Sequence, residues 1–408
     1  MITTFYPPYS FGGDGICVQR LANALAKRGH RVDVVHCRDA HRLLAGKKPV
    51  TDYDDHPNVT VHGLKSPWGF LSPLSTQQTG LPGFKSSQLR QIMKREFDVI
   101  HYHNVSLMGG AGVMELGAGI KLCTLHDYWF ICPTHVMFKF NRNPCTRQHC
   151  FVCSLTYKRP PEMWRHLGLL RKAARHVNAF IAPSLFAEDM HRRMGFDVPF
   201  VRLPNFVPEV EIASAPSFDV AGPTEKPYFL FVGRLEKLKG LQTIIPIFRR
   251  YEKAQLLIAG SGSDEPWLRR LAAGCDNIRF LGYISDIRKL LALYRKAMAV
   301  VLPSLCYEVF PLVLPEAFQQ KTPVIVRNLG AMAEIIDESG GGFAYDAEAE
   351  LVAAIDQLMA SPRRRRELGL RGYRAYQKHW TTEVHLRRYL ALIEKIARQR
   401  RDSPSGVT

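Results

Sequence analysis

Short apolar segments alternate with helical patterns along the whole chain, and this alternation constrains the fold more than any other feature. The segments are rich in β-branched residues, bounded by polar or turn residues, and too short for helices. They comprise residues 2–6, 32–36, 59–63, 99–101, 122–125 and 180–182, then 229–232, 256–259, 278–281, 300–302 and 324–326. Strands that alternate with helices predict an α/β fold with parallel sheets covered on both faces.

A proline-rich stretch divides the alternating pattern into two parts. The 408 residues are enough for two domains. Residues 208–227 contain four prolines and few large apolar side chains, which is typical of a linker. We expect an N-terminal α/β domain over 1–207, with a cysteine-rich insertion at 130–160, and a C-terminal α/β domain over 228–380. Residues 381–408 should form a helix that packs back on the N-terminal domain, followed by a polar tail.

Charge and hydropathy narrow the choice of partners. The chain carries 55 Lys and Arg against 37 Asp and Glu, a formal charge of +18. That balance favours anionic partners such as phosphorylated small molecules, anionic lipid or nucleic acid, although a solvated basic surface produces the same excess. No apolar run reaches the roughly 18–20 residues of a membrane-spanning helix, and no signal peptide precedes the first strand. We expect a cytoplasmic protein whose nine cysteines are thiols or metal ligands.

Four motifs that could bind a ligand follow predicted strands. In doubly wound sheets ligands bind beyond the carboxyl ends of the strands, and with two such domains the site is expected in the cleft between them. The first motif places Gly12 and Gly13 between the first strand and the first helix. Glycines there let the backbone approach a ligand, and a helix N-terminus offers unpaired N–H groups. The alternative is an ordinary turn.

The second motif opens the C-terminal domain. Gly233 and Arg234 leave its first strand, and Lys239 follows shortly after. A planar guanidinium and a compact ammonium at one strand end suit a diphosphate. The alternative is a surface loop with two solvated cations.

The third motif pairs two acids, Glu308 and Glu316, at a strand-to-helix junction. Carboxylates are strong acceptors that can hold sugar hydroxyls. The N–H groups of Phe310, Leu312 and Val313 between them could face a phosphate. Ordinary helix capping by the second acid is the alternative.

The fourth motif is His126, directly after a strand of the first domain. Its position faces the same predicted cleft, although a lone histidine is more often a satisfied structural group. All four motifs fall at strand carboxyl ends, in the order that a two-domain cleft requires.

Taken together, these motifs resemble family 4 of the retaining glycosyltransferases. Members use a nucleotide-sugar donor on two Rossmann-like domains facing each other across a cleft, the GT-B fold. The resemblance covers nearly the whole chain. Its most specific elements are Gly233-Arg234, Lys239-Gly240 and the pair Glu308 and Glu316. Supporting elements are Asp98-Val-Ile-His101-Tyr-His103, Ala182-Pro-Ser184, Leu203-Pro-Asn205, Ile258-Ala-Gly260-Ser-Gly262 and Phe280-Leu-Gly282-Tyr283.

The resemblance implies catalytic roles for four residues. Arg234 and Lys239 would neutralise the donor diphosphate as charge builds on the departing phosphate. Glu308 would contact hydroxyls of the donor sugar, and His126 would touch the sugar and stabilise the anomeric carbon through its carbonyl. The family usually needs no metal for this chemistry and retains the anomeric configuration.

A second group of residues is implied to bind the donor without taking part in the chemistry. Glu316 would bind the ribose hydroxyls. The other donor-binding positions are Gly12, Gly13, Gly233, Phe310, Leu312 and Val313.

The resemblance therefore implies a retaining, metal-independent hexosyltransferase. It would move a sugar to a lipid-linked or polysaccharide acceptor in cell-envelope glycan synthesis. One alternative is another nucleotide-sugar enzyme of the same fold, an epimerase or a phosphorylase. Another is a catalytically silent scaffold, because Val309 and Pro311 stand where many relatives carry glycine. A nucleic-acid partner is not expected, since no RNA-binding aromatic motif or helix-turn-helix pattern accompanies the charge.

Four cysteines lie close together in the predicted insertion. Cys132, Cys145, Cys150 and Cys153 suit a tetrahedral zinc ion that orders an acceptor-side segment. An iron–sulfur cluster and buried thiols are the alternatives.

A basic amphipathic stretch follows the cysteines. Between residues 158 and 177, Trp164, Leu167, Leu170 and Val177 share a pattern with six cations. Such a stretch can lie on an anionic membrane, which would place the protein peripherally on the inner face of the membrane. The alternative is a core-facing helix with a solvated basic face.

Overall fold

The computed structural model describes residues 1–45, 54–210 and 226–402. The chain divides into two compact units. Unit 1 comprises Met1–Val136, Gln148–Asn205 and Thr382–Thr408, and unit 2 comprises Met137–Arg147 and Phe206–Thr381. Residues 137–147 thus group with unit 2, although the sequence-based boundaries assign all of 130–160 to the N-terminal domain. Most of the predicted linker and the end of the predicted tail lie outside the described residues.

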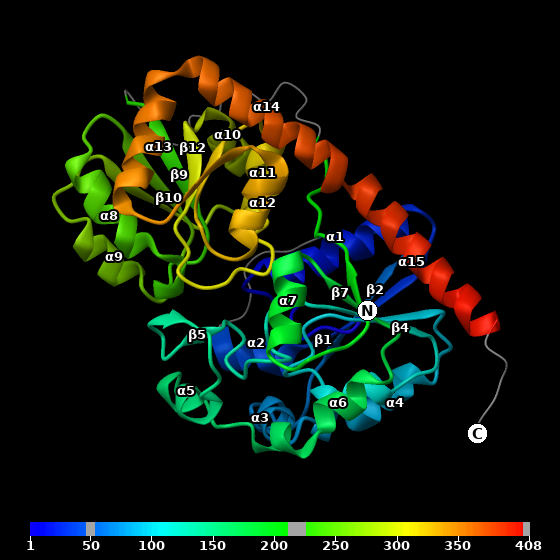
Figure 1. The fold of residues 1–408 in the computed structure, drawn as a ribbon. Coiled ribbons are helices and arrows are strands. Elements are labelled where there is room, and N and C mark those ends of the chain that lie inside the picture. The colour runs from blue at the N-terminus through cyan, green and yellow to red at the C-terminus, as the bar shows by residue number, and fades with distance from the viewer. Residues whose placement is uncertain (46–53, 211–225, 403–408) are drawn as a thin grey trace. The chain divides into compact units, whose positions relative to one another are not determined.

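Unit 1 is an α/β unit with a parallel sheet (Figure 1). Its strands are β1 (Val32–Cys37), β2 (Val59–Leu64), β3 (Val99–Tyr102), β4 (Ile120–Thr124), β7 (Ala179–Ala182) and β8 (Phe200–Arg202). The longer helices are α1 (Gly13–Lys27), α2 (Arg38–Ala45), α3 (Leu71–Thr79), α4 (Ser86–Met93), α7 (Leu185–Arg193) and α15 (Thr382–Asp402). Shorter ones are η1 (Gly83–Lys85), η2 (Ala111–Glu115), α5 (Cys150–Thr156), η3 (Met163–Leu167) and α6 (Leu169–Ala174).

The first residues of the chain join the two halves of this sheet. β1 pairs with β2, and the order of the remaining strands is β3-β4-β7-β8. Ile2 bridges to Val35 on one side and to Tyr102 on the other, both in parallel. The predicted strand over 2–6 is therefore reduced to bridges at one residue, because the chain turns away after Thr4 into a tight Tyr6–Tyr9 bridge.

The last described helix, α15, packs one face against the rest of unit 1. The hydroxyl of Tyr389 lies 3.0 Å from Nδ1 of His101, and Nδ1 of His385 lies 2.8 Å from the carbonyl of Pro204. Leu386 and Ile396 are buried on the same face. The periodic apolar residues predicted this helix, and the structure extends it by two residues before and six after the predicted 384–396 core.

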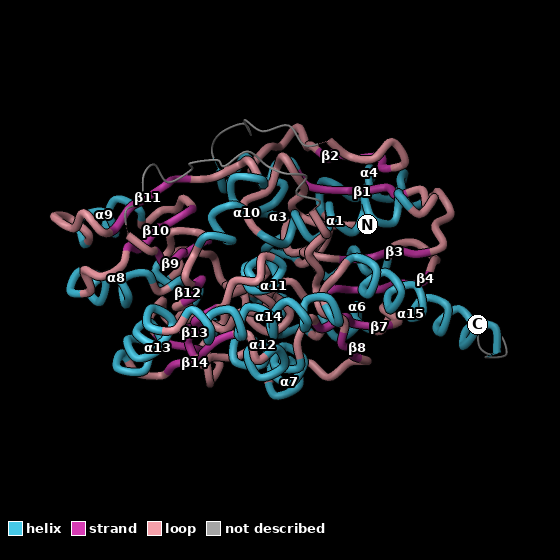
Figure 2. Tube along the Cα trace, turned by 90° about the horizontal axis from the view of Figure 1, so that it is seen from above, coloured by secondary structure: helices cyan, strands magenta, loops and turns pink. Residues whose placement is uncertain are grey.

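Unit 2 contains one parallel sheet of six strands, in the order β11-β10-β9-β12-β13-β14 (Figure 2). The strands are β9 (Tyr228–Val232), β10 (Gln255–Ala259), β11 (Ile278–Gly282), β12 (Ala299–Leu302), β13 (Val324–Arg327) and β14 (Gly342–Tyr345). Numbered within the unit, this order is 3-2-1-4-5-6, the Rossmann arrangement. Its topological switch point lies between β9 and β12, where a ligand is expected.

Helices cover both faces of the unit 2 sheet, with α8 and α9 together on one side and α11 and α12 on the other (Figure 1). The helices are η4 (Lys237–Lys239), α8 (Leu241–Arg250), α9 (Glu265–Leu271), α10 (Ile287–Lys296), α11 (Val313–Gln319), α12 (Ala331–Ser339), α13 (Glu348–Ala360) and α14 (Pro362–His379). Phe229, Leu230 and Phe231 of β9 are fully buried because the central strand is covered on both faces. Its continuous apolar run is the sequence signature of that position.

The α/β class and the parallel sheets are as predicted, and most predicted strands are found within two residues of their expected bounds. The prediction missed β8, β14 and a small hairpin of β5 (Phe138–Lys139) and β6 (Asn143–Pro144). These strands are short, and β8 and β14 lie at sheet edges, so their sequences lack the buried apolar run of a central strand. None of the helices in the described ranges is long and apolar enough to span a bilayer.

Candidate functional site

Unit 2 brings Lys239 and Glu308 together at its switch point. Lys239 ends the short turn after β9, and Glu308 lies in the loop after β12, so the neighbouring strands deliver them to one place. Nζ of Lys239 donates to Oε1 of Glu308 at 2.7 Å. The hydroxyl of Ser304, fully buried, donates to the same oxygen at 2.7 Å. The two charged side chains are only 17% and 14% exposed.

Both members of this pair are charged at neutral pH. Burial alone would raise the pKa of Glu308, but Lys239, the Ser304 hydroxyl and Arg234 outweigh it, so the pKa lies below its usual value. Burial alone would lower the pKa of Lys239, but the Glu308 carboxylate outweighs it and the pKa is raised. The site therefore holds a buried ammonium group that could also interact with an anionic ligand. Beside it lies a carboxylate that can accept hydrogen bonds from hydroxyl groups.

Arg234 lies in the same loop but closer to solvent. Its guanidinium donates to Oε1 of Glu236 at 2.6 Å, and its side chain is 47% exposed. Arg234 also contributes to the electrostatic stabilisation of the Glu308 carboxylate. The two predicted cations thus differ. Lys239 belongs to a buried ion pair, whereas Arg234 lies closer to solvent.

Two glycines let the loops of this site pass close to one another. Gly240 has φ of 78°, and a Cβ there would lie 2.0 Å from the carbonyl oxygen of Pro303. A Cβ on Gly260 would lie 1.9 Å from the carbonyl oxygen of Gly233. The loops after β9, β10 and β12 therefore pack backbone against backbone, which only glycine permits.

The remaining predicted donor-binding residues of unit 2 lie around α11. Glu316, half-buried in its first turn, accepts a hydrogen bond from the Tyr294 hydroxyl at 3.0 Å. Phe310 packs edge-on against Trp380, and Leu312 directly precedes the helix. The helix begins at Val313, two residues before the predicted start near Pro315.

In unit 1, His126 follows β4 as predicted. Its Nε2 lies 2.9 Å from Nδ1 of His103, whose ring is tilted against that of His101 with the two centroids 4.0 Å apart. Burial lowers the pKa of His126 to about 4, and the nearby Asp127 opposes this only in part. His126 is therefore a neutral imidazole at physiological pH.

Gly12 and Gly13 lie at the N-terminus of α1, where the prediction placed them. Gly12 caps the helix with extended backbone, and Gly13 is exposed in its first turn. Asp14 follows and accepts from the N–H of Gly15 at 2.8 Å. These glycines and His126 belong to unit 1, whereas Lys239 and Glu308 belong to unit 2.

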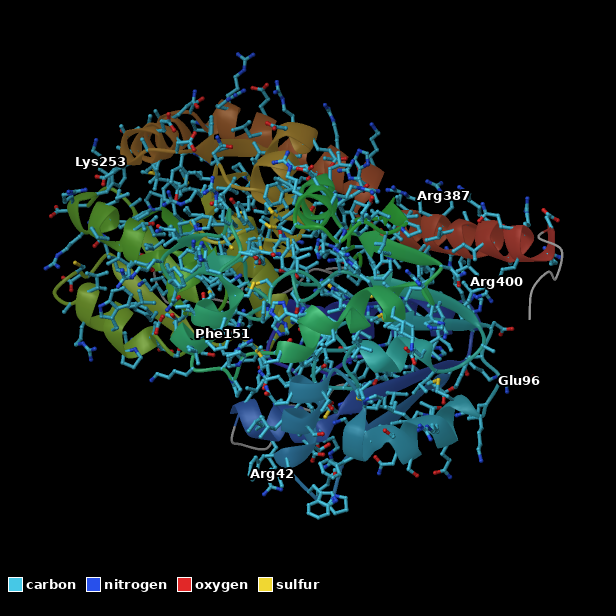
Figure 3. All side chains as sticks on the ribbon, turned by 60° about the horizontal axis from the view of Figure 1, so that its bottom comes forward. Arg42, Glu96, Phe151, Lys253, Arg387 and Arg400 are labelled. Carbon is cyan, nitrogen blue, oxygen red and sulfur yellow. The ribbon has the colours of Figure 1, made fainter. Side chains whose placement is uncertain are left out.

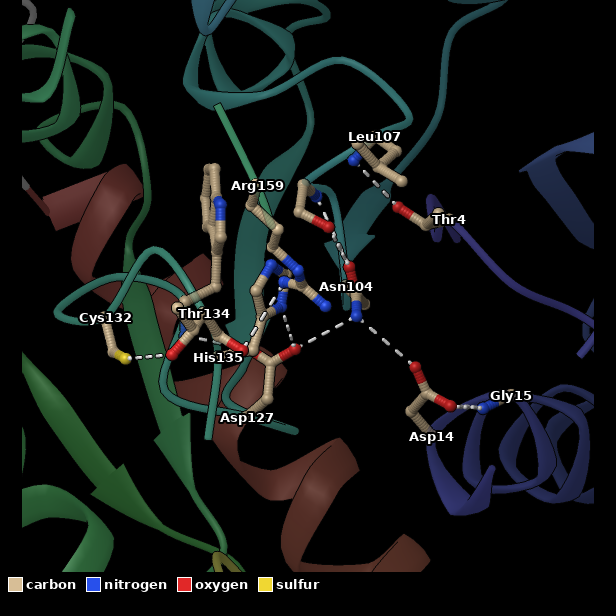
Figure 4. A network of polar contacts seen from close by, with 12 residues as sticks. Thr4, Asp14, Gly15, Asn104, Leu107, Asp127, Cys132, Thr134, His135 and Arg159 are labelled. Atoms are coloured by element: carbon tan, nitrogen blue, oxygen red, sulfur yellow. Dashed lines mark hydrogen bonds and ion pairs between the residues drawn. The ribbon is translucent and has the colours of Figure 1, made fainter. Parts of the chain in front are cut away.

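A polar network that the sequence analysis did not anticipate joins Asp14 to two neighbouring loops (Figure 4). Nδ2 of Asn104 donates to Oδ2 of Asp127 at 3.0 Å and reaches Oδ2 of Asp14 at 3.4 Å. Nδ1 of His135 lies 2.9 Å from Oδ2 of Asp127. Asn104 lies three residues after the predicted strand 99–101, and Asp127 lies two residues after the predicted strand 122–125. This position near strand ends was the available signal.

The four cysteines predicted to bind zinc do not form a ligand set. Among the residues that the structure describes, no three His, Cys, Asp or Glu side chains are grouped so as to hold a metal ion. Cys145 groups with unit 2, whereas Cys132, Cys150 and Cys153 belong to unit 1. Sγ of Cys132 instead lies 3.2 Å from the hydroxyl of Thr134. Proximity in sequence was the basis of the zinc hypothesis, which stays a prediction.

The basic stretch over 158–177 is not one continuous helix. Gly168 adopts a left-handed conformation with φ of 72° and separates η3 from α6. Trp164 is buried and donates from Nε1 to the carbonyl of Gln77 at 2.7 Å, and Leu170 and Val177 are buried as well. Leu167, by contrast, is 81% exposed. Most of the apolar pattern thus faces the core of unit 1.

Comparison with protein families decides the identity of the chain. Residues 11–210 match the family model Glycosyltransferase Family 4, and residues 216–375 match the family model Glycosyl transferases group 1. The chain belongs to glycosyltransferase family 4. The sequence resemblance is thereby confirmed.

Curated relatives of this family 4 glycosyltransferase match along most of its length. It is 26% identical to the D-inositol 3-phosphate glycosyltransferase of Pseudarthrobacter chlorophenolicus, over 94% of this chain and 91% of that protein. It is 27% identical to the phosphatidyl-myo-inositol mannosyltransferase of Mycobacterium leprae, over 86% and 85% of the two chains.

Solved structures share the fold of this family 4 glycosyltransferase. Sucrose-phosphate synthase from Thermosynechococcus elongatus aligns with a TM-score of 0.72 at 21% identity, over 97% of this chain and 98% of that one. Anabaena HepE in complex with UDP-glucose aligns with a TM-score of 0.66 at 16% identity, over 96% and 98%. The predicted fold class of two Rossmann-like domains, GT-B, is confirmed.

Proposed function

We propose that this glycosyltransferase moves a hexose from a nucleotide sugar, with retention, to a hydroxyl of a lipid-linked or polysaccharide acceptor in cell-envelope glycan synthesis. The buried pair of Lys239 and Glu308 at the switch point of unit 2 carries the proposal. A buried ion pair is an expensive feature for stability alone, since both ions lose their hydration. Its position is where a Rossmann-like sheet binds nucleotides.

The two cations of unit 2 are proposed to bind the donor diphosphate. In transfer, the bond from the anomeric carbon to the β-phosphate oxygen breaks, and its electron pair leaves with the nucleoside diphosphate. Lys239 and Arg234 stabilise the charge that develops on that oxygen. The acceptor hydroxyl bonds through its oxygen to the anomeric carbon from the same face and passes its proton to the departing phosphate oxygen, so that configuration is retained without a catalytic metal.

The carboxylates and backbone groups are proposed to orient the donor. Glu308 accepts hydrogen bonds from sugar hydroxyls, and Glu316 accepts them from the ribose. Donor-binding roles in the loops are proposed for Gly233, Phe310, Leu312 and Val313 of unit 2 and for Gly12 and Gly13 of unit 1.

His126 is proposed to contact the donor sugar as a neutral hydrogen-bonding group. Its pKa of about 4 leaves it uncharged at pH 7. A neutral imidazole beside the sugar avoids placing positive charge next to an anomeric carbon that becomes electron-poor. Its backbone carbonyl contributes the partial negative charge that favours that state.

Names and complexes of similar proteins support the choice of substrates. The Anabaena structure holds UDP-glucose, which supports a nucleotide-sugar donor. The mycobacterial relative is a phosphatidyl-myo-inositol mannosyltransferase, which supports a lipid-linked acceptor.

Peripheral attachment to an anionic membrane is proposed for unit 1. Phe151, Val152 and Leu155 of α5 and Met163 and Leu167 around η3 are more than half exposed. Figure 3 shows Phe151 among the side chains of this unit. Cations at 158, 159, 171, 172 and 175 lie near them in sequence. Apolar side chains flanked by cations suit anionic headgroups, at about 1 kcal/mol per cation near the surface.

Vesicle sedimentation tests the membrane proposal. At low salt the protein should sediment with phosphatidylglycerol vesicles, and Leu167→Ser should weaken this. Tyr283→Ser, which alters an exposed side chain of unit 2, is the matched control. Equal sedimentation of Leu167→Ser and the unaltered protein, or none at low salt, contradicts the proposal.

A thermal-shift panel of nucleotide sugars tests the donor proposal. A ligand at 100 times its Kd stabilises the protein by about 2.7 kcal/mol. Glu308→Ala and Lys239→Ala should abolish sugar transfer and retain the fold. Glu265→Ala, which removes the carboxylate partner of the exposed Arg269, is the control. Full activity in both site variants refutes the assignment, and a donor that binds without ever being turned over indicates a silent scaffold.

Zinc analysis of the purified protein tests the separate cysteine hypothesis.

A further inference from the structure

A buried histidine that the proposed mechanism does not use contacts His126. His103 directly follows β3, and His126 lies two residues after the neighbouring strand β4, so strand pairing brings the two rings together. Nδ1 of His103 lies 2.9 Å from Nε2 of His126, and the rings are stacked with their centroids 5.2 Å apart. His103 is only 4% exposed, whereas His126 is partly exposed. Of the two, His126 is the ring that a ligand can reach.

A second buried histidine holds the ring of His103 in place. The ring of His101 is tilted against it, with the two centroids 4.0 Å apart. His101 is fixed at both nitrogens, since Nε2 lies 2.8 Å from the hydroxyl of Thr124 and Nδ1 lies 3.0 Å from the hydroxyl of Tyr389. The ring of His103 therefore has a defined position, from which it can orient His126.

All three histidines are neutral at physiological pH. Burial lowers the pKa of His126 to about 4, and it lowers the pKa of His101 and of His103 well below the usual value. A neutral imidazole carries one proton, on one of its two nitrogens. The contact between His103 and His126 is therefore a single N–H···N hydrogen bond, in which one ring donates and the other accepts.

The second nitrogen of His103 decides which ring donates. Nε2 of His103 is buried and has no hydrogen-bond partner among the described residues. If His126 were the donor, the proton of His103 would have to be on this nitrogen, as a buried N–H without an acceptor. Among backbone groups, a buried N–H without an acceptor is rarer than an acceptor without a donor. His103 therefore donates from Nδ1, and its Nε2 keeps only a lone pair.

The same hydrogen bond determines what His126 offers to a ligand. Because Nε2 of His126 accepts from His103, the single proton of the His126 ring is on Nδ1. In the part of the chain that the structure describes, no hydrogen bond to this Nδ1 is found. The ring thus presents an N–H group that an oxygen atom of a ligand can accept.

We propose that His103 is a positioning residue, which holds His126 in the tautomer with the proton on Nδ1 so that His126 donates a hydrogen bond to an oxygen of the donor sugar. This rests on the proposed function, in which His126 contacts that sugar. His103 itself touches no substrate, and its effect passes through His126. In the opposite tautomer, Nδ1 of His126 would offer only a lone pair, which binds a hydroxyl proton but no sugar oxygen.

His103→Leu and His103→Asn are the matched pair of variants for the test. The two side chains have the same branched shape and size, but only asparagine has an N–H group that can replace the Nδ1 donor. His176→Leu, at an exposed histidine of unit 1, is the control. Thermal unfolding measures whether each variant folds.

Nucleotide sugars and bare nucleotides are the probes. Calorimetry measures binding of UDP-glucose, UDP-N-acetylglucosamine and GDP-mannose, and of UDP and GDP beside them. His103→Leu should weaken nucleotide-sugar binding by about 5- to 10-fold, the effect of one hydrogen bond, and leave binding of the bare nucleotide unchanged. His103→Asn should restore most of the affinity, and the control should match the unaltered protein. In a His126→Ala background, His103→Leu should have no further effect.

Long-range nitrogen–proton correlation NMR of the ligand-free protein measures the tautomer directly. We expect the proton of His126 on Nδ1 in the unaltered protein and in His103→Asn, and a shift toward Nε2 in His103→Leu. A proton on Nε2 in the unaltered protein overturns the proposal, and this result does not depend on any variant that fails to fold.

Three binding results also overturn the proposal. These are no loss in His103→Leu, an equal loss of nucleotide sugar and bare nucleotide in that variant, and no recovery in His103→Asn. Failure of the unaltered protein to bind any nucleotide sugar, or full nucleotide-sugar binding by His126→Ala, instead overturns the proposed function.

Discussion

Gly240 shows how one residue type determines the geometry of the proposed donor site. It directly follows Lys239, adopts φ of 78°, and lies where a Cβ would come within 2.0 Å of the carbonyl oxygen of Pro303. Gly274 has nearly the same φ, 77°, but nothing lies within 4 Å of its would-be Cβ. The two glycines therefore separate the cost of a left-handed backbone from the cost of a steric clash.

Alanine at these two positions should give different results. Gly274→Ala should lower the free energy of unfolding by about 1 kcal/mol, the cost of a left-handed alanine. Gly240→Ala should cost at least ~2 kcal/mol more, because the clash must move the backbone that carries Lys239. Urea unfolding measures both, and nucleotide-sugar affinity should fall only in Gly240→Ala. Equal losses of stability would falsify the close-packing explanation.

The low pKa of His126 has a measurable consequence for catalysis. Because burial lowers this pKa to about 4, the ring stays neutral from pH 8 down to about pH 5 and protonates only below that. We expect its imidazole resonances in NMR to stay constant over pH 5.5–8, while those of free histidine in the same buffer shift around its ordinary pKa of about 6.5. A His126 titration with a midpoint above 6 contradicts the buried environment.

Part of the candidate site could be predicted from sequence, because strand ends determine where side chains gather. Lys239 and Glu308 follow predicted strands, and the strand order brings them within 2.7 Å. His135 could not be found in this way. It contacts Asp127, eight positions earlier in the sequence, through a tight loop in which His135 is left-handed, and no periodic pattern predicts such a loop. Spacing along a loop likewise does not determine which thiols come together, so the zinc hypothesis stays a prediction.

At the scale of elements, α15 stabilises unit 1 through a buried polar contact as well as through apolar packing. Tyr389 and His101 are each only 2% exposed, and the tyrosine hydroxyl lies 3.0 Å from the ring nitrogen. The helical period of residues 384–396 predicted the buried face. It did not predict the polar partner, which comes from β3 nearly 300 residues earlier.

Removing this hydroxyl should destabilise unit 1. Tyr389→Phe leaves a buried ring nitrogen of His101 without this partner, so we expect a loss of about 1–3 kcal/mol in the free energy of unfolding. Tyr283→Phe, on a side chain that is 63% exposed, should change it by no more than about 0.5 kcal/mol. Thermal or urea unfolding compares the two variants. Equal melting of both indicates that water replaces the lost partner.

The breaks between elements were harder to predict than the elements themselves. The basic stretch looked amphipathic by composition, yet Gly168 in a left-handed conformation divides it, and Trp164 points into the core. β14 lies at the sheet edge and starts with a glycine, so its sequence carries little strand signal. Central strands such as β9 were predictable because both of their faces are buried.

At the scale of the whole molecule, buried neutral histidines make stability depend on pH. Burial lowers the pKa of His36, His191 and His385 to about 4 each. Unfolded histidine has a pKa of about 6.5, so the unfolded chain binds more protons between these values. Protonation then favours unfolding, and stability should fall as pH drops below 6.5.

This loss is predicted to be about 1–2 kcal/mol per buried histidine between pH 7 and pH 5. The urea midpoint should fall accordingly, and unfolding at pH 5 should take up protons, which calorimetry in buffers of different ionisation enthalpy detects. His191→Phe, which keeps a ring in the core, should make the decline shallower, whereas His176→Ala should leave it unchanged. A midpoint that stays constant from pH 7 to pH 5 contradicts the prediction.

Unit 1 contains both the beginning and the described C-terminal helix of this sequence, whereas nearly all of unit 2 is one uninterrupted stretch between them. During synthesis on the ribosome, the residues of unit 2 emerge before the helix that covers β3 and β4. The apolar surface of unit 1 that α15 covers therefore stays exposed until translation has passed residue 402. A premature stop codon just before α15 would leave unit 2 whole and unit 1 a target for chaperones and proteases.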